Sequence, residues 1–187
     1  LIDDIPKFCY FSKAALAALN YLNWTPDIVH CHDWQAALVP LYLRTTFKDT
    51  NVGRAGAILT IHNLRFQGVY DRKTIQYWSD LPDYVFNKDC MTQNWLDANM
   101  LKGGITYSNV VTTVSNTYAG EIQTEEYGEG LEEHLRYHSS KILGIVNGID
   151  TDIWNPATDK LLAAQYDSQS VIKNKKANKK IKYVINL

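Results

Sequence analysis

Four short apolar segments, each followed at once by polar side chains, constrain the fold of this 187-residue chain more than any other feature. They lie at residues 28–29, 56–61, 110–114 and 142–146, and each is predicted to be a strand. Segments compatible with helices separate them. Uniformly apolar strands that alternate with helices are typical of a parallel sheet covered by helices on both faces. The sequence therefore predicts the α/β fold class.

Two helices are predicted around the first strand. Apolar side chains recur at helical spacing between Phe8 and Leu22, which indicates a helix that ends before the strand. Asp33 follows the strand and is a candidate N-cap for a second helix that runs to Leu43. Proline disrupts the hydrogen bonds of a helix interior, so we expect a kink at Pro40.

The middle of the chain has a weaker pattern. A further helix is expected over about residues 95–107. Residues 64–94 carry many aromatic side chains without a clear period, and they are predicted to form a long connection. That connection either packs on the core or lines a carbohydrate site.

The polar side chains after the strands are expected to meet at one edge of the sheet. In open parallel sheets, ligands bind just outside the carboxyl ends of the strands. The side chains expected there are His30, His32, Asp33, His62, Asn63, Ser115, Asn147 and Asp150. Imidazole, carboxylate and amide groups suit hydrogen bonds to hydroxyls and the support of a cationic, sugar-like transition state. The pattern therefore favours carbohydrate chemistry. His30 lies two residues deeper in its strand than His32, so we expect it to serve stability instead.

Several other classes of protein do not fit the sequence. No apolar segment approaches the roughly 18 residues of a membrane span, and no membrane partner is expected. Six lysines lie within residues 173–187 and leave the rest of the chain acidic, which argues against a nucleic-acid partner. The chain has no Gly-x-Ser-x-Gly elbow and no phosphate-binding Gly-x-x-x-x-Gly-Lys-Ser/Thr loop.

A metal site is also not expected. His30 and His32 would point to the same side of a strand, as zinc ligands can, but no further ligands are evident in the sequence. The three cysteines, Cys9, Cys31 and Cys90, form no Cys-x-x-Cys pair. We interpret them as structural thiols.

Six sequence segments, taken together, resemble the bacterial glycogen synthases and plant starch synthases. They are PDIVHCHDWQAA (residues 26–37), TIHNLRFQG (60–68), LKGGITYSNVVTTVS (101–115), YGEGL (127–131), IVNGID (145–150) and WNPATD (154–159). They occur in the family's order and spacing and cover nearly the whole chain. Each segment is weak evidence alone, but the combination is specific.

The resemblance implies a GT-B glycosyltransferase, in which two Rossmann-like domains face each other across a cleft. The implied reaction transfers glucose from ADP-glucose to the non-reducing end of an α-1,4-glucan, glycogen or starch, with retention of configuration. The implied partners are these two substrates and the C-terminal GT-B domain, and no cofactor or metal is implied. The implied location is the cytoplasm in a bacterium or the plastid stroma in a plant.

The resemblance also implies roles for individual residues. His62 matches the family's histidine beside the donor glucose, where its carbonyl and ring would support charge at the anomeric centre, and Asp33 matches an aspartate that touches the sugar region; both are predicted to be catalytic. The predicted substrate-binding residues are Asn63, Asn147, His32 and Gln67. Lys102 matches the family's pattern and is expected in a structural ion pair. Gln35 stands where many relatives have histidine, which makes it a poor catalytic candidate.

The chain also departs from the family's pattern. The Lys-Thr-Gly-Gly-Leu loop that cradles the donor phosphates and the second domain are not in this sequence. We therefore expect residues 1–157 to be a partial N-terminal domain, and residues 158–187 to be the crossing to the C-terminal domain and its first helix. The chain alone is expected to be inactive. Two alternatives stay open: a non-catalytic glucan-binding or structural module, and another retaining GT-B transferase.

Overall fold

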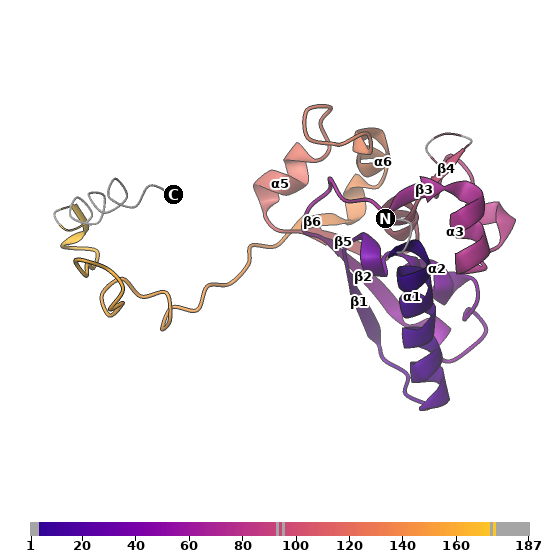
Figure 1. The fold of residues 1–187 in the computed structure, drawn as a ribbon, viewed down its shortest axis with the longest axis horizontal. Coiled ribbons are helices and arrows are strands. Elements are labelled where there is room, and N and C mark those ends of the chain that lie inside the picture. The colour runs from indigo at the N-terminus through magenta and orange to yellow at the C-terminus, as the bar shows by residue number, and fades with distance from the viewer. Residues whose placement is uncertain (1–3, 93, 95, 173, 175–187) are drawn as a thin grey trace. The chain divides into compact units, whose positions relative to one another are not determined.

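The computed structural model describes residues 4–92, 94, 96–172 and 174. Its main element is a four-stranded parallel sheet in the order β1-β2-β5-β6 (Figure 1). The strands are β1 (Ile28–His32), β2 (Gly56–Ile61), β5 (Val110–Thr113) and β6 (Ile142–Gly144). β3 (Val69–Asp71) and β4 (Asp97–Asn99) form a separate antiparallel pair. The predicted strands and the α/β class are confirmed.

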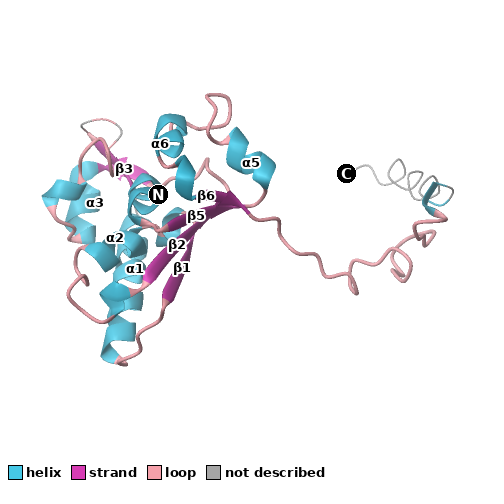
Figure 2. Ribbon diagram, turned by 180° about the vertical axis from the view of Figure 1, so that it is seen from behind, coloured by secondary structure: helices cyan, strands magenta, loops and turns pink. Residues whose placement is uncertain are grey.

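Helices connect these strands. They are α1 (Asp4–Tyr21), α2 (Leu38–Arg44), α3 (Arg72–Ser79), α4 (Met100–Tyr107), α5 (Asn116–Glu121) and α6 (Glu132–Tyr137). α1 and α2 lie on the same side of the sheet (Figures 1 and 2). α4 packs closely there as well, since a Cβ added to Gly104 would lie 2.8 Å from the Cβ of Ala37 and 3.0 Å from Leu59 Cδ2. These helices and the sheet enclose the apolar core.

The opposite face of β1 is open among the described residues. Val29 and Cys31 point toward the core, whereas Ile28, His30 and His32 are exposed, and Ile28 keeps 55% of its surface. Successive side chains of a strand point to opposite faces. The alternation of this strand therefore marks one polar face, and the expectation of helices on both faces is not met at β1.

The second predicted helix differs from the structure. A short 3₁₀ turn (Trp34–Ala36) follows Asp33. The side chain of Asp33 makes no capping hydrogen bond to this turn. α2 begins only at Leu38, so Pro40 lies in its first turn. A proline there removes no hydrogen bond within the helix, because the first amides of a helix have no partner inside it. The predicted cap and the predicted kink were therefore wrong.

The middle segment is more regular than its sequence indicates. The helix expected over residues 95–107 begins only at Met100, after strand β4. The supposed long connection contains β3 and α3. α3 buries only Ile75 and Ser79, while Tyr77 and Trp78 are exposed. Because large aromatic residues lie on its exposed face as well, the sequence of α3 shows no clear helical period.

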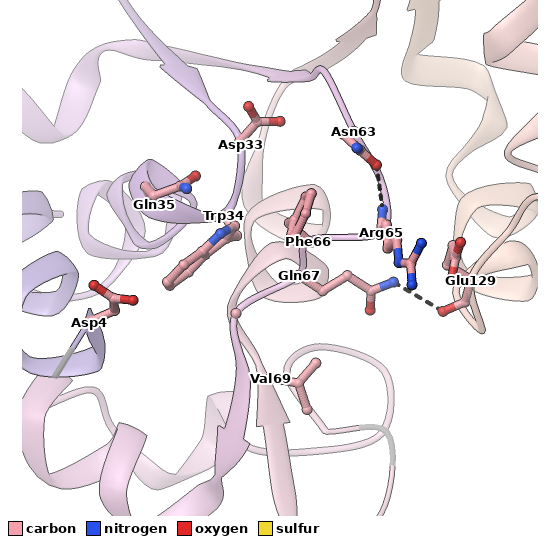
Figure 3. Close-up of a pocket in the computed structure, with 11 residues that line it drawn as sticks. Asp4, Asp33, Trp34, Gln35, Asn63, Arg65, Phe66, Gln67, Val69 and Glu129 are labelled. Atoms are coloured by element: carbon pink, nitrogen blue, oxygen red, sulfur yellow. Dashed lines mark hydrogen bonds between the residues drawn. The ribbon is translucent and has the colours of Figure 1, made fainter. Parts of the chain in front are cut away.

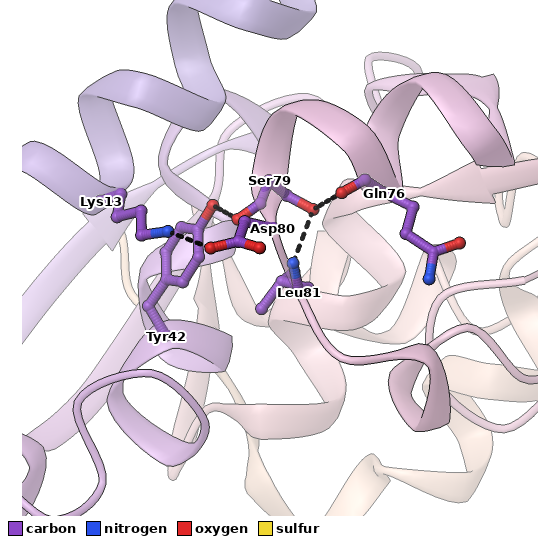
Figure 4. Close-up of polar contacts among 6 residues, drawn as sticks. All are labelled: Lys13, Tyr42, Gln76, Ser79, Asp80 and Leu81. Carbon is purple, nitrogen blue, oxygen red and sulfur yellow. Dashed lines mark hydrogen bonds and ion pairs between the residues drawn. The ribbon is translucent and has the colours of Figure 1, made fainter.

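Hydrogen bonds join α1, α2 and α3 at one junction (Figure 4). The hydroxyl of Tyr42 donates to the carbonyl of Ser79 at 2.7 Å, and burial raises the pKa of this tyrosine. Lys13 Nζ pairs with Asp80 Oδ2 at 2.9 Å. Asp80 ends α3 in the left-handed conformation, with φ 54°. These contacts hold α1 and α2 against the end of α3.

The chain divides into two compact units, Leu1–Val146 and Asn147–Leu187. In the described part of the second unit turns predominate, such as the one in which Asp150 Oδ1 accepts from the amides of Asp152 and Ile153. The predicted domain boundary after residue 157 stays a prediction, and most of the lysine-rich segment lies outside the described residues. In the part of the chain that the structure describes, no helix is long and apolar enough to cross a membrane.

Candidate functional site

A pocket of about 750 Å³ lies where β1 and β2 end (Figure 3). The segments that follow these two strands supply most of its lining. The lining residues are Asp4, Asp33, Trp34, Gln35, Asn63, Arg65, Phe66, Gln67, Gly68, Val69 and Glu129. The pocket thus occupies the edge of the sheet that the sequence predicts for ligands, and it includes three of the predicted site residues: Asp33, Asn63 and Gln67.

Asp33 is held in an uncommon backbone conformation beside this pocket. Its φ is 55° and its ψ is −171°, a region that residues other than glycine rarely adopt. Two hydrogen bonds hold it: its amide donates to the carbonyl of Thr60 at 2.8 Å, and its Oδ1 accepts from the amide of His62 at 2.8 Å. The carboxylate therefore ties the end of β1 to the end of β2. Strained residues of this kind cluster at functional sites.

Aromatic side chains form one wall of the pocket. The indole of Trp34 packs edge-on against Phe8, with ring centroids 5.0 Å apart. Gly68 lies against the six-membered ring of this indole, because a Cβ there would overlap Trp34 Cε3. Gly68 also has a φ of 64°, which a side chain would strain. Phe66 is 59% exposed and lies in the middle of the view in Figure 3. Aromatic rings of this kind pack well against the apolar faces of sugars.

Gln67 is held from both sides by the protein. It is 8% exposed, its Nε2 donates to the carbonyl of Glu129 at 3.0 Å, and its Oε1 accepts from Asn99 Nδ2 at 2.6 Å. Asn63 is exposed, and its Oδ1 accepts from the amide of Arg65 at 3.0 Å. These bonds fix the shape of the loop after β2, as Figure 3 shows.

The charges of the lining are mainly negative. Asp4, Asp33 and Glu129 are acidic, and Arg65 is the one basic residue among those that line the pocket. A hydrogen bond from Lys7 lowers the pKa of Asp4, which keeps that group ionised. Such a lining suits a neutral, hydroxyl-rich ligand or a developing positive charge better than a diphosphate.

Three histidines lie side by side next to the pocket, and we call them the edge cluster: His30, His32 and His62. Nδ1 of His32 and Nε2 of His62 are 3.0 Å apart and share a hydrogen bond. Neither ring is among the pocket-lining residues. Asp33 joins the two features, because it lines the pocket and also binds the amide of His62.

Comparison with known proteins identifies the family. A family model described as the starch synthase catalytic domain matches residues 1–137. This chain belongs to the starch synthase catalytic domain family. The predicted family and the predicted GT-B type of α/β fold are confirmed.

Individual members of the family agree with this assignment. The glycogen synthase of Lachnospira eligens is 48% identical over 178 residues, which are 95% of this chain and 37% of that protein. The glycogen synthase of Thermotoga petrophila is 50% identical over 159 residues, which are 84% of this chain and 32% of that protein. The catalytic domain of starch synthase IV from Arabidopsis thaliana, solved bound to ADP and acarbose, has a TM-score of 0.81 at 40% identity and matches 99% of this chain and 38% of its own. The chain thus spans well under half the length of these relatives.

The remaining predicted residues of this starch synthase family member have other positions. Asn147 belongs to the second compact unit, so its role in the site stays a prediction. Ser115 caps α5, since its hydroxyl accepts from the amide of Tyr118 at 2.9 Å. Sequence analysis did not single out Trp34, Phe66 or Glu129, although all three lie in the segments that carry the resemblance.

Lys102 has a structural role in this family member. It is 7% exposed, and its Nζ donates to the carbonyls of Lys88 and Thr92 at 2.6 and 2.8 Å. None of the described ion pairs includes it, so the expected ion pair is replaced by bonds to backbone carbonyls. Burial lowers the pKa of this lysine, although Cys90 and Asp89 oppose the shift.

The cysteines are structural, as predicted. Cys9, Cys31 and Cys90 are buried and form no disulfide, and burial raises the pKa of each thiol to about 12. Thiols with such pKa values are poor nucleophiles at neutral pH. Within the described residues, no three histidine, cysteine, aspartate or glutamate side chains gather in a way that could hold a metal ion.

Proposed function

We propose that this chain is part of a glucosyltransferase that moves glucose from ADP-glucose to the non-reducing end of an α-1,4-glucan with retention of configuration. The observation that carries the proposal is the Asp33–His62 hydrogen bond, which joins the pocket at the sheet edge to the edge cluster in a member of the starch synthase family. The ADP and acarbose bound to the Arabidopsis relative support a nucleotide and a glucan as ligands of the same type of domain.

In this proposal His62 and Asp33 are the catalytic residues. The ring and the carbonyl of His62 meet the donor glucose, and the negative charge of Asp33 favours the positive charge that develops at the anomeric carbon. Asp33 also fixes the backbone of His62, because its Oδ1 accepts from that amide at 2.8 Å. The two residues therefore act at one point on the edge of the sheet.

The proposed substrate-binding residues are Asn63, Asn147, His32 and Gln67. Asn63 and Gln67 lie in the loop after β2, and this loop carries the exposed ring of Phe66. The exposed ring of Phe66 provides apolar surface for the face of a glucose unit, the side-chain amides can donate or accept hydrogen bonds with hydroxyls, and the carboxylates can accept them. A glucan fits this lining better than a phosphate group does, because acidic residues outnumber Arg65.

Glucose transfer by the full-length protein tests the proposal. Incubation with radiolabelled ADP-glucose and glycogen is expected to place label in the polymer, and an α-1,4-specific glucanase is expected to release it. UDP-glucose in a parallel reaction measures donor preference. Glucan binding without transfer from either donor would favour the non-catalytic module, and transfer to a different acceptor would favour another retaining GT-B transferase.

The isolated 187-residue chain provides a separate prediction. We expect no measurable transfer from ADP-glucose to glycogen, because stabilisation of a diphosphate leaving group needs cations and the pocket lining offers Arg65 alone. The measurement is the same radiochemical assay with purified chain from a host that lacks its own synthase. Turnover above background would contradict this expectation.

A further inference from the structure

The edge cluster is a stack of three imidazole rings on the open face of the sheet. The ring centroids of His30 and His32 are 4.4 Å apart with the planes at 28°, and those of His32 and His62 are 5.3 Å apart at 30°. The parallel register pairs His32 with Thr60 in β2, and His62 follows directly after the end of that strand at Ile61. His32 therefore lies between a residue of its own strand and the proposed catalytic histidine.

The hydrogen bond between His32 and His62 restricts both rings. A neutral imidazole has one protonated nitrogen and one that accepts, so a bond between Nδ1 of His32 and Nε2 of His62 requires that one of these nitrogens is protonated and the other is not, and it couples the tautomers of the two rings. The protonation of Nε2 decides whether Nδ1 of His62 donates or accepts. Nδ1 is also the ring nitrogen that remains for a ligand, because no other hydrogen bond of the His62 ring is present among the described residues.

His62 is thus held at two places by residues from the end of β1. Asp33 accepts from its backbone amide at 2.8 Å, and His32 binds its ring at 3.0 Å. The backbone bond alone leaves rotation of the ring unrestricted. The hydrogen bond between the rings of His32 and His62 supplies that restriction.

We propose that His32 is a positioning residue that holds the ring of His62 in one tautomer and one orientation, with Nδ1 available to the sugar. This inference rests on the proposed function of His62. For His32 it replaces the substrate-binding role that the family resemblance implies and that the proposed function includes. In this inference Nδ1 of His32 binds the ring of His62, and His62, not His32, contacts the sugar.

The surroundings of His32 favour its neutral form. Burial, His30 and His62 lower the pKa of His32, and the nearby carboxylate of Asp33 opposes the shift. These are the titratable groups that face His32 from β1, from the end of β2 and from the turn after β1. A neutral His32 has one protonated ring nitrogen and one that accepts, so its Nδ1 can take either role in the hydrogen bond with His62.

Two variants of the full-length protein separate the bond from the stack. His32→Phe keeps an aromatic ring between His30 and His62 but removes the hydrogen bond. His32→Asn loses the stack but keeps a polar atom near the position of Nδ1. We expect His32→Phe to lower kcat about tenfold with KM little changed, which corresponds to one oriented hydrogen bond. We expect His32→Asn to restore most of kcat.

Nitrogen NMR of selectively ¹⁵N-histidine-labelled protein reads the tautomer directly. The signals of His62 are expected to show a single tautomer in the unsubstituted protein and in His32→Asn, and averaged signals in His32→Phe. Circular dichroism melting curves establish that each variant is folded. If the His32→Asn variant does not fold but the His32→Phe variant does, the NMR comparison between His32→Phe and the unsubstituted protein still decides the question.

Several outcomes would overturn the proposal. A folded His32→Phe with unchanged kcat and a single His62 tautomer shows that the bond does not position the ring. Equal losses in both variants that fall mainly on KM assign His32 to direct contact with substrate. If the unsubstituted protein transfers no glucose, the proposed function fails, whereas the NMR comparison still decides whether His32 fixes His62.

Discussion

The five histidines of the chain form two clusters whose surroundings differ. The edge cluster lies on the open face of the sheet, with all three residues exposed and the carboxylate of Asp33 beside it. The second group, which we call the α6 cluster, consists of His134 and His138, whose rings are 4.6 Å apart and nearly perpendicular at 74°. It lies at α6 beside Lys102 and Lys141.

The α6 cluster is built to stay neutral. Burial, followed by the charges of His138 and Lys102, lowers the pKa of His134 to about 3. Burial and Lys141 lower the pKa of His138 to about 4. His134 Nε2 shares a hydrogen bond with the hydroxyl of Thr106 at 3.2 Å. These two rings pack and hydrogen-bond, and a positive charge on either is disfavoured.

The edge cluster has a different setting, because its three rings are exposed and the carboxylate of Asp33 lies beside it. A ring in that position can meet a ligand and can support positive charge there. The comparison teaches that histidine content alone does not mark the site: what distinguishes the two clusters is access to solvent and the sign of the neighbouring charge. Substitutions in the two clusters should therefore affect different measurements.

The largest expected effect is on catalysis, at His62. In the full-length protein, His62→Ala should lower kcat on the order of 10²-fold and raise KM far less, because it removes a polar group whose interaction strengthens as charge develops in the transition state. Steady-state kinetics with ADP-glucose and glycogen, together with a melting curve, provide the measurement.

His134→Gln is the matched control for this prediction. The glutamine amide can keep a hydrogen bond to Thr106, and the residue belongs to the α6 cluster. We expect its kcat to equal that of the unsubstituted protein. A folded His62→Ala protein with normal kcat would remove the main catalytic assignment, and equal losses in both variants would show that the two clusters do not differ in function.

An intermediate effect is expected on stability in acid, at the α6 cluster. The folded-state pKa values of about 3 and about 4 lie below the ordinary value of 6.5, so the unfolded chain binds more protons between these limits. Stability is therefore full above pH 6.5, begins to fall as the pH drops below 6.5, and continues to fall down through the folded pKa values. Both rings keep some contact with water, so we expect a modest decrease in Tm, on the order of 2 to 4 °C between pH 7.5 and 5 for this pair.

The same glutamine variant tests the origin of that decrease. His134→Gln cannot take up the proton, so its Tm should depend less on pH over this range than that of the unsubstituted protein. Differential scanning calorimetry at several pH values measures the difference. An identical pH dependence in the two proteins would mean that His134 does not contribute to acid destabilisation.

Much of this site could be predicted from the sequence because strand ends carry local signals. The apolar segments 56–61 and 110–114 end in polar residues, and parallel strands bring such ends to one edge. Asp33, Asn63 and Gln67 were found at the pocket for this reason and through the family resemblance. Each short strand could be predicted from its own residues, without knowledge of its neighbours in the sheet.

Other features depend on contacts between distant parts of the chain. The carboxylate of Asp33 binds the amide of His62, 29 residues away, whereas sequence analysis assigned it to a nearby helix end. Glu129 enters the site through its carbonyl, which accepts from Gln67 62 residues earlier. A backbone carbonyl leaves no trace in residue type, and the left-handed φ of Asp33 is not encoded by a glycine. These parts of the site needed the folded structure.

The smallest effect is expected at His30, where the structure changes the reasoning that the sequence supports. Sequence analysis places His30 deeper in the strand and expects it to serve stability, yet the residue is exposed and its Nε2 makes one hydrogen bond, to Thr60 Oγ1 at 2.7 Å. Thr60 keeps a second partner, Thr112 Oγ1 at 2.6 Å, when His30 is removed. His30→Ala should therefore cost no more than about 1 kcal/mol of unfolding free energy. It should leave kcat within about twofold, a change of less than 0.5 kcal/mol in the barrier, because His30 stacks on His32 and does not touch His62. Urea denaturation and steady-state kinetics on the same preparation measure both quantities. A folded His30→Ala protein as slow as His62→Ala would show that the three rings of the edge cluster act as one catalytic unit.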